Sequence, residues 1–239
     1  MDIYQAKIKR VEERFDSIFS YYLEIPDEFS WELGTNVQIA LPGFQDGEQI
    51  DEDLVRRLSI MTLNEEGEIG FCTRIREPRS LYKEKLSKLG PGDSLFLFDP
   101  ISRVKFVDQN RPLVLLSHGV GVTSYRTLVL DYVKWASANH KLHLINVERD
   151  SSELFPELRE LSGRHGFELH TVADRAAYNQ LLESEKELLK ESEVFIIGSK
   201  EFIVANIKKL RELGVRDEQM HLDKKPEKRN MLFNLADQA

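Results

Sequence analysis

The stretch LVLLSHGVGVTSYRTLVLDYV, residues 113–133, decides the fold. An apolar strand runs into two glycines, Gly119 and Gly121, and then into an amphipathic helix. Such a junction can bind an anion, because glycines let the backbone approach a ligand and the helix N-terminus presents unpaired N–H groups. The two glycines alone are equally compatible with a tight turn that binds nothing.

The pattern around this stretch predicts a parallel sheet. Four more short apolar segments follow, LHLINV, FELHTV, EVFIIG and QMHL, and amphipathic helices separate them. We expect one charged helix through residues 179–191 and another through 202–213 that Gly214 closes, while the tail 223–239 has no assigned path. Five strands alternating with helices predict a Rossmann-like parallel sheet with helices on both faces.

Residues before the stretch follow a different period. Six short segments, several of them alternating apolar and polar residues, are separated by turn signals such as Pro42-Gly43 and Pro91-Gly92. This is typical of a small antiparallel barrel. One helix should interrupt it, with Ser80 as N-cap and Gly90 just past its end. The chain is therefore expected to form two domains, a six-stranded antiparallel β-barrel over 1–109 and a five-stranded α/β domain over 110–239.

Composition excludes several classes of protein. The net charge of -8 over 239 residues argues against nucleic acid as a partner, because phosphate binding is driven by clustered cations. The single cysteine, Cys72, excludes an intramolecular disulfide and a site built from several thiolates, and it fits a reducing cytoplasm. The histidines show no metal-ligand spacing, and no segment reads as a signal peptide or a membrane span.

Four motifs in order carry a family resemblance. They are RRLS at 56–59, RSLYKEKLSKLGPGD at 79–93, SHGVGVTSYRTLV at 117–129 and FIIGSKEFIVANIKKLRELGV at 195–215. In this order and spacing the chain resembles the ferredoxin-NADP reductase-like flavoprotein reductases over nearly its whole length. The resemblance implies an FAD-binding barrel domain followed by an NAD(P)-binding α/β domain.

The resemblance also implies a set of flavin contacts in the first domain. Arg56 and the helix that begins near Ser80 would bind the FAD pyrophosphate, since cations and helix N–H groups suit a phosphate. Ser59 would place its hydroxyl near the hydride-accepting nitrogen and is the catalytic candidate. The remaining implied contacts are Leu58, Cys72, Thr73, Arg74 and Leu81. Without the resemblance, Arg56 reads as a solvated strand residue and Ser80 as an ordinary cap.

In the second domain the resemblance implies a nicotinamide dinucleotide site. Gly119, Gly121 and Thr123 would receive the pyrophosphate, and Gly198 and Ser199 form the turn after the fourth strand of the sheet. A further candidate, Arg149, follows a strand end where a guanidinium would suit the 2′-phosphate of NADPH, although Arg149 between two acidic residues is equally compatible with a surface ion pair.

The sequence departs from the family pattern at several positions. Leu58 stands where an aromatic ring usually stacks on the flavin, which removes a stacking contact. His118 and Ser124 replace a small residue and a proline around the glycine turn, and Ile197 replaces a cysteine. A terminal aromatic that covers the flavin is absent unless Phe233 takes that place.

Three functions stay open at this stage. The first is a flavoenzyme that takes a hydride from NADPH or NADH onto FAD and passes electrons to a protein carrier or a small molecule. The second is an FAD-binding electron-transfer or regulatory subunit that has lost NAD(P)H oxidation, and the third is an interaction module that binds neither cofactor. The basic stretch 74–88 would either dock an acidic electron carrier or serve only the FAD phosphates and water.

Overall fold

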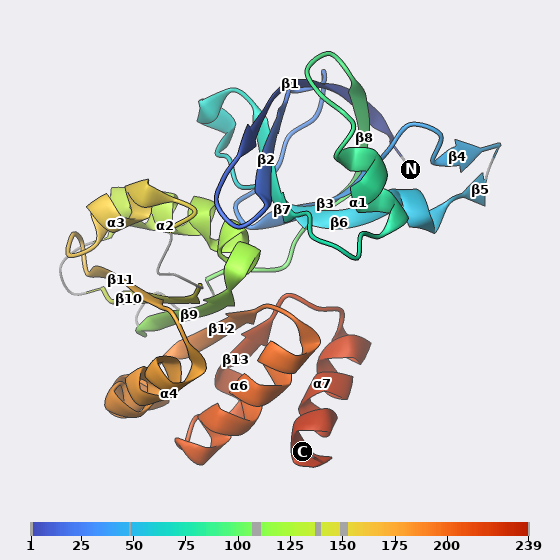
Figure 1. Ribbon diagram of the computed structural model, residues 1–239. Helices are drawn as coiled ribbons and strands as arrows, with labels where there is room; N and C mark the ends of the chain where they lie inside the picture. The colour runs from blue at the N-terminus through green and yellow to red at the C-terminus, as the bar shows by residue number, and fades with distance from the viewer. Residues whose placement is uncertain (1, 48, 107–110, 137–139, 149–152, 239) are drawn as a thin grey trace. The chain divides into compact units, whose positions relative to one another are not determined.

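The computed structural model describes residues 2–47, 49–106, 111–136, 140–148 and 153–238. The chain divides into two compact units, Met1–Ser102 and Arg103–Ala239. Each unit has its own sheet (Figure 1).

The first unit is a curled antiparallel sheet of six strands in the order β6-β3-β8-β1-β2-β7. The strands are β1 (Tyr4–Glu13), β2 (Ile18–Leu23), β3 (Thr35–Ala40), β6 (Val55–Ser59), β7 (Ile69–Arg74) and β8 (Ser94–Ser102). Just past β6, the Met61 N–H donates to the carbonyl of Gly70 in β7, with 2.8 Å between N and O. The sheet is thus a partly open barrel, which confirms the six predicted strands.

Short elements complete this unit. A two-stranded hairpin, β4 (Gln45–Asp46) and β5 (Gln49–Ile50), is fully exposed, and the short 3-10 helix η1 (Glu52–Leu54) leads into β6. The helix α1 (Leu81–Leu86) follows β7 and buries Tyr82 and Leu86 in the core.

Ser80 caps α1 as expected, but Gly90 does not end it. The helix stops at Leu86, with Ser87 as the C-cap. The Ser87 hydroxyl donates to the carbonyl of Glu84, with 2.8 Å between the oxygens, and so satisfies one end of the helix. Gly90 lies further on, where its N–H donates to the Asp93 carboxylate.

The second unit is a parallel sheet of five strands in the order β11-β10-β9-β12-β13. The strands are β9 (Leu113–His118), β10 (Leu142–Val147), β11 (Phe167–Val172), β12 (Glu193–Ile197) and β13 (Met220–Leu222). All five match predicted strands. The order reverses between β9 and β12, where an α/β sheet leaves a crevice at the carboxyl ends of its strands.

Helices cover both faces of this sheet (Figure 1). The helices α2 (Thr123–Trp135) and α3 (Pro156–Leu161) lie on one face. The other face carries α4 (Arg175–Ser184), α5 (Lys186–Glu191), α6 (Lys200–Glu212) and α7 (Pro226–Gln238). In the described residues, no helix is long and apolar enough to cross a membrane.

Two helical regions differ from the sequence-based expectation. The single charged helix expected through 179–191 is broken at Glu185 into α4 and α5. The Ser184 hydroxyl donates to the carbonyl of Leu181, with 2.8 Å between the oxygens, and such bonding competes with the helical ladder. The tail, which had no assigned path, forms α7 and buries Leu232 and Ala236 in the apolar cluster of α6.

Each unit has an apolar cluster made only of its own residues. In the first unit it is centred on the inward faces of the six strands and on α1, and in the second on β9, β12 and the helices α4–α7. Burial of this kind stabilises a fold by about 25 cal/mol for each Å² of apolar surface removed from water. The candidate side chains of each unit are therefore fixed by a local core.

Candidate functional site

The strand β6 places Arg56 beside α1. The Arg56 guanidinium donates to the carbonyls of Glu52 and Val55, with N–O distances of 2.9 and 2.6 Å. Its central carbon lies 5.4 Å from the centre of the Tyr82 ring, which belongs to α1. Arg56 thus stays close to α1 without forming an ion pair in the described residues.

The start of α1 holds two of the predicted contacts, Ser80 and Leu81. Ser80 accepts a hydrogen bond from the Lys83 N–H at 3.4 Å, so its hydroxyl caps the helix. Leu81, the first helical residue, is 44% exposed. The first N–H groups of a helix lack internal partners, so this end favours an anion.

Three cations gather around this helix start. Burial, followed by the positive charges of Arg56 and Arg74, lowers the pKa of Lys83 below its usual value. Arg74 is itself paired with Asp16 at 3.2 Å, whereas Lys83 has no ion pair among the described residues. We call Arg56, Arg74 and Lys83 the cation cluster. The positive charge of Arg56 and Lys83, which have no ion pair among the described residues, fits a phosphate or pyrophosphate.

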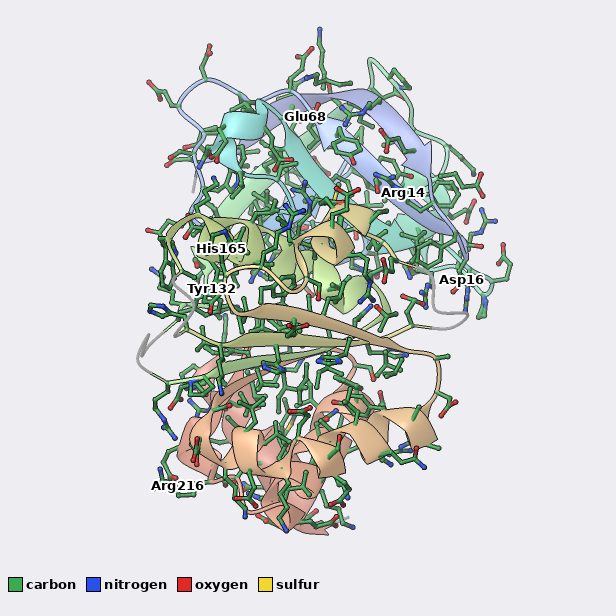
Figure 2. All side chains as sticks on the ribbon, turned by 90° about the vertical axis from the view of Figure 1, so that its left-hand side faces the viewer. Arg14, Asp16, Glu68, Tyr132, His165 and Arg216 are labelled. Carbon is green, nitrogen blue, oxygen red and sulfur yellow. The ribbon has the colours of Figure 1, made fainter. Side chains whose placement is uncertain are left out.

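The rest of the basic stretch 74–88 is largely neutralised. Arg76 pairs with Asp16 in the turn between β1 and β2 (Figure 2). Arg79 pairs with Glu77 at 2.7 Å, and Lys88 pairs with Glu84 at 2.8 Å. These pairs leave Arg56, Lys83 and the exposed Lys85 as the nearby cations without an ion pair among the described residues.

The other predicted flavin contacts lie on β6 and β7. Leu58 is half-buried and packs against the apolar cluster, and Ser59 follows it at the end of β6. Thr73 is 6% exposed and pairs with Phe19 of β2. The Cys72 thiol is buried, with Ser20 Oγ at 3.1 Å and Met61 Sδ at 3.2 Å. These contacts commit the Cys72 side chain to packing.

In the second unit the glycine turn is a 3-10 turn, η3 (Gly119–Val122), that runs directly into α2. Gly119 has φ of 56°, in the left-handed region that favours glycine. A Cβ on Gly121 would lie 3.0 Å from the carbonyl oxygen of Ile197 in β12. Packing against Ile197 therefore favours glycine at position 121 whether or not a ligand binds there.

The first residue of α2 carries an unsatisfied polar atom. Thr123 is 3% exposed, and its Oγ1 has no hydrogen-bond partner in the described part of the chain. A buried hydroxyl without a partner costs about 1 to 3 kcal/mol. Its position beside the glycine turn fits a ligand group that would satisfy it.

The turn after β12 is shaped by an aromatic ring. A Cβ on Gly198 would lie 2.6 Å from the Phe202 ring, so only glycine leaves room for the ring there. Ser199 caps α6, because its hydroxyl accepts from the Phe202 N–H at 3.2 Å. Gly198 and Ser199 together place Phe202 at the carboxyl end of β12.

A cleft of about 850 Å³ opens at the carboxyl ends of β9, β10 and β11. His118, Val147 and Ala173 lie at these strand ends, and α4 and α6 form its walls. Both helices begin here, so two helix N-termini face the cleft and favour an anion. His118 directly precedes the glycine turn, which therefore adjoins the cleft along the chain.

Three rings form a row along the cleft. The Phe202 ring lies 5.8 Å from the His118 ring and 5.9 Å from the Tyr178 ring, measured between centres. Aromatic faces of this kind stack on nucleobases, with about 1 to 3 kcal/mol for each base. Desolvation raises the pKa of Tyr178 above its usual value, so its hydroxyl stays protonated at neutral pH.

Sequence reasoning missed two features of this cleft. Arg175, the first residue of α4, lines it with no ion pair in the described ranges, and the capping residue Asp174 before it was the available signal. The ring row joins residues far apart in sequence, for which the sequence offered no signal. Arg149, the predicted phosphate contact, lies outside the described residues.

Comparison with known proteins agrees with this architecture. A ferredoxin NADP+ reductase of Neisseria gonorrhoeae, solved with bound FAD and NADP, matches 93% of this chain and 98% of its own with a TM-score of 0.74 and 17% sequence identity. A ferredoxin-NADP+ reductase of Plasmodium falciparum, solved with 2′P-AMP, matches 93% and 96% with a TM-score of 0.73 and 15% identity. The chain therefore has the two-domain fold of the ferredoxin-NADP reductase-like flavoproteins, which confirms the fold that the resemblance implied.

The similarity in sequence covers a smaller part of the chain than the similarity in fold. The toluate 1,2-dioxygenase electron transfer component of Pseudomonas putida is 28% identical over 163 residues, which cover 64% of this chain and 46% of that protein. The chain thus spans about half the length of this curated relative. No family model matches the chain.

Proposed function

We propose that the chain is a flavin-dependent oxidoreductase that takes a hydride from NAD(P)H onto FAD and passes the electrons to an acceptor. The observation that carries the proposal is the cation cluster at the start of α1, in which Arg56 and Lys83 have no ion pair among the described residues and fit the FAD pyrophosphate. It lies on a barrel with the fold of reductases solved with FAD. The cleft of the second unit supports a nicotinamide dinucleotide as the second ligand.

In this proposal the first unit binds FAD. Arg56, Arg74 and Lys83 hold the pyrophosphate together with the N–H groups at the start of α1. Ser59 offers its hydroxyl to the reactive edge of the flavin, and the backbone of Cys72 and Thr73 runs beside the ring. When bound, FAD supplies the hydride and electron chemistry, and the protein supplies orientation and electrostatics.

The second unit binds the dinucleotide. The glycine turn and Thr123 receive its pyrophosphate, and the adenosine half enters the cleft, where its base stacks on the accessible rings of His118 and Phe202. Arg175 offers an exposed guanidinium without an ion pair among the described residues, which suits a 2′-phosphate. We therefore propose NADPH as the preferred donor, with Arg149 as a further predicted contact.

The acceptor is proposed only as a class. The relative from P. putida is an electron transfer component of a dioxygenase, so a protein acceptor is the first candidate. The ion pairs of the stretch 74–88 leave little free charge for an acidic carrier outside the cation cluster. A cytoplasmic location stays a prediction from the single cysteine.

The proposal is tested by anaerobic titration of the full chain with NADPH and NADH while the flavin spectrum is recorded. We expect a yellow protein that both donors bleach, NADPH at lower concentration. Arg175→Ala should raise the KM for NADPH about tenfold, which corresponds to about 1.4 kcal/mol, and leave NADH unchanged as an internal control. A chain that takes up no flavin at high FAD concentration would refute the function, and one that binds FAD but is not reduced would be the electron-transfer subunit instead.

A further inference from the structure

A buried polar pair lies in the apolar cluster of the second unit. Tyr178 is 4% exposed and Asn206 is 3% exposed. The Tyr178 hydroxyl donates to Asn206 Oδ1 at 2.5 Å, and Asn206 Nδ2 donates to the carbonyl of Phe202 at 2.8 Å. Leucine and isoleucine side chains of the cluster surround the pair.

This pair joins the two walls of the cleft. Tyr178 belongs to α4 and Asn206 to α6, and both residues line the cleft. The second hydrogen bond of Asn206 goes to the backbone carbonyl of Phe202, one turn earlier in α6, and so orients the Asn206 amide toward Tyr178. The Tyr178–Asn206 hydrogen bond thus links α4 to α6 inside the cleft wall, and the exposed Lys209–Glu183 ion pair links the same two helices.

Stability alone does not account for polar groups at this place. Replacing both partners of a buried hydrogen bond by apolar groups of similar shape is nearly neutral or stabilising, whereas replacing one leaves the other unsatisfied. A directional bond at 2.5 Å, however, fixes the spacing of two helices more narrowly than apolar contact does.

We propose that Tyr178 and Asn206 are positioning residues that set the spacing of the cleft walls for the adenosine half of the nicotinamide dinucleotide. The proposal rests on the proposed function, because it needs the dinucleotide to bind in this cleft. The pair contacts Phe202, a residue of the cleft wall, and does not contact the reacting atoms. It therefore acts on dinucleotide affinity and leaves FAD binding unchanged.

The test compares three variants of the full chain, Tyr178→Phe, Asn206→Leu and the double variant. Binding of NADP+ and of NAD+ is measured by calorimetry, FAD binding by its spectrum, and stability by the melting temperature. Each single variant should melt lower and bind the dinucleotide about tenfold more weakly. The double variant should recover the parent's melting temperature but keep the weakened affinity, with KM raised and kcat little changed.

Two controls separate positioning from stability. Tyr132→Phe removes a buried hydroxyl of α2 (Figure 2) that has no hydrogen-bond partner in the described residues, so it should not lower the melting temperature and should leave dinucleotide affinity unchanged. Gln219→Ala removes four hydrogen bonds at a site that does not line the cleft, two that its amide donates to the carbonyls of Lys190 and Ser192 and two that it accepts from Arg216. It should therefore lower stability but not affinity.

Recovery of dinucleotide affinity in the double variant would overturn the inference, because the pair would then serve stability alone. A loss of affinity in Gln219→Ala as large as that in the single variants would also overturn it, since affinity would then follow stability. The inference is supported if the double variant still binds the dinucleotide weakly while Gln219→Ala binds it like the parent, whatever the melting temperatures of the two variants. If the parent chain binds neither NADP+ nor NAD+, the proposed function fails at the cleft and the inference falls with it.

Discussion

Replacing Lys83 by methionine should have opposite effects on FAD binding and on the apoprotein. The side chain keeps its length but loses the charge that completes the cation cluster. Loss of one charge-assisted contact corresponds to about 1.5 to 3 kcal/mol, so the Kd for FAD should rise about ten- to a hundredfold. Without FAD the same charge is unfavourable, because burial and the two neighbouring arginines lower the pKa of Lys83 in the folded state.

The sign of this second effect follows from proton binding. Between the lowered pKa and the usual value near 10.5, the unfolded chain binds more protons at this group than the folded chain does, so the stability of the apoprotein rises with pH. At neutral pH both forms are charged and the folded form bears the penalty. The Lys83→Met apoprotein should therefore be at least as stable as the parent at pH 7, and the rise of stability in the alkaline range should be smaller.

The assay is FAD titration of the apoprotein by flavin fluorescence, together with urea unfolding of the apoprotein at pH 7 and pH 10. Lys85→Met is the matched control, because Lys85 is an exposed lysine of the same helix and does not contribute to the pKa shift of Lys83. The control should bind FAD like the parent. If Lys83→Met binds FAD as tightly as Lys85→Met, the cation cluster is not the pyrophosphate site.

Three further predictions concern single side chains. Gly121→Val places a branched side chain against the carbonyl of Ile197, so NAD(P)H oxidation should be lost while FAD stays bound; an unchanged KM for both donors would make the turn structural only. Ser59→Ala should slow flavin reduction about ten- to a hundredfold, or about 1.4 to 2.7 kcal/mol in barrier, in stopped-flow measurements at saturating FAD; reduction at the parent rate would remove Ser59 from the mechanism. Burial, aided by His170, lowers the pKa of His143, so the folded protein resists protonation of this ring and its stability should fall as the pH drops below about 6.5. In urea unfolding at a series of pH values, His143→Gln should reduce this loss of stability. An unchanged dependence of stability on pH would contradict the assignment.

The sequence predicted those elements whose pattern is local. The strands around Leu113–Ser117 and the cap at Ser80 follow from residues within one or two turns of each other, and the structure has both. The break of the helix at Glu185 was not predictable, since the residues around it continue the helical pattern without a proline or glycine. Tertiary contacts, not propensity, decide such a point.

The candidate site likewise contains residues that the sequence predicts and residues that only the folded structure brings together. Contacts at the glycine turn and at the start of α1 lie in contiguous motifs, so the sequence named their residues, and their roles stay predictions. The ring row depends on side chains from β9, α4 and α6 meeting in space, and nothing near Tyr178 in sequence points to Phe202. Phe233, considered as a cover for the flavin, lies instead in α7, where the guanidinium carbons of Arg211 and Arg229 are each 5.6 Å from its ring centre.

The separate apolar clusters of the two units bear on how the chain is made. The cluster of the first unit ends at Phe98, so every residue of that core has been translated before β9 begins. At a synthesis rate of about 5 to 20 residues per second, translation of the rest of the chain takes on the order of ten seconds, which is long compared with the folding of a small domain. The residues of the barrel and its cation cluster are thus complete while the cleft of the second unit is still being synthesised. Under the proposed function, FAD therefore meets its site on the nascent chain before NADPH does.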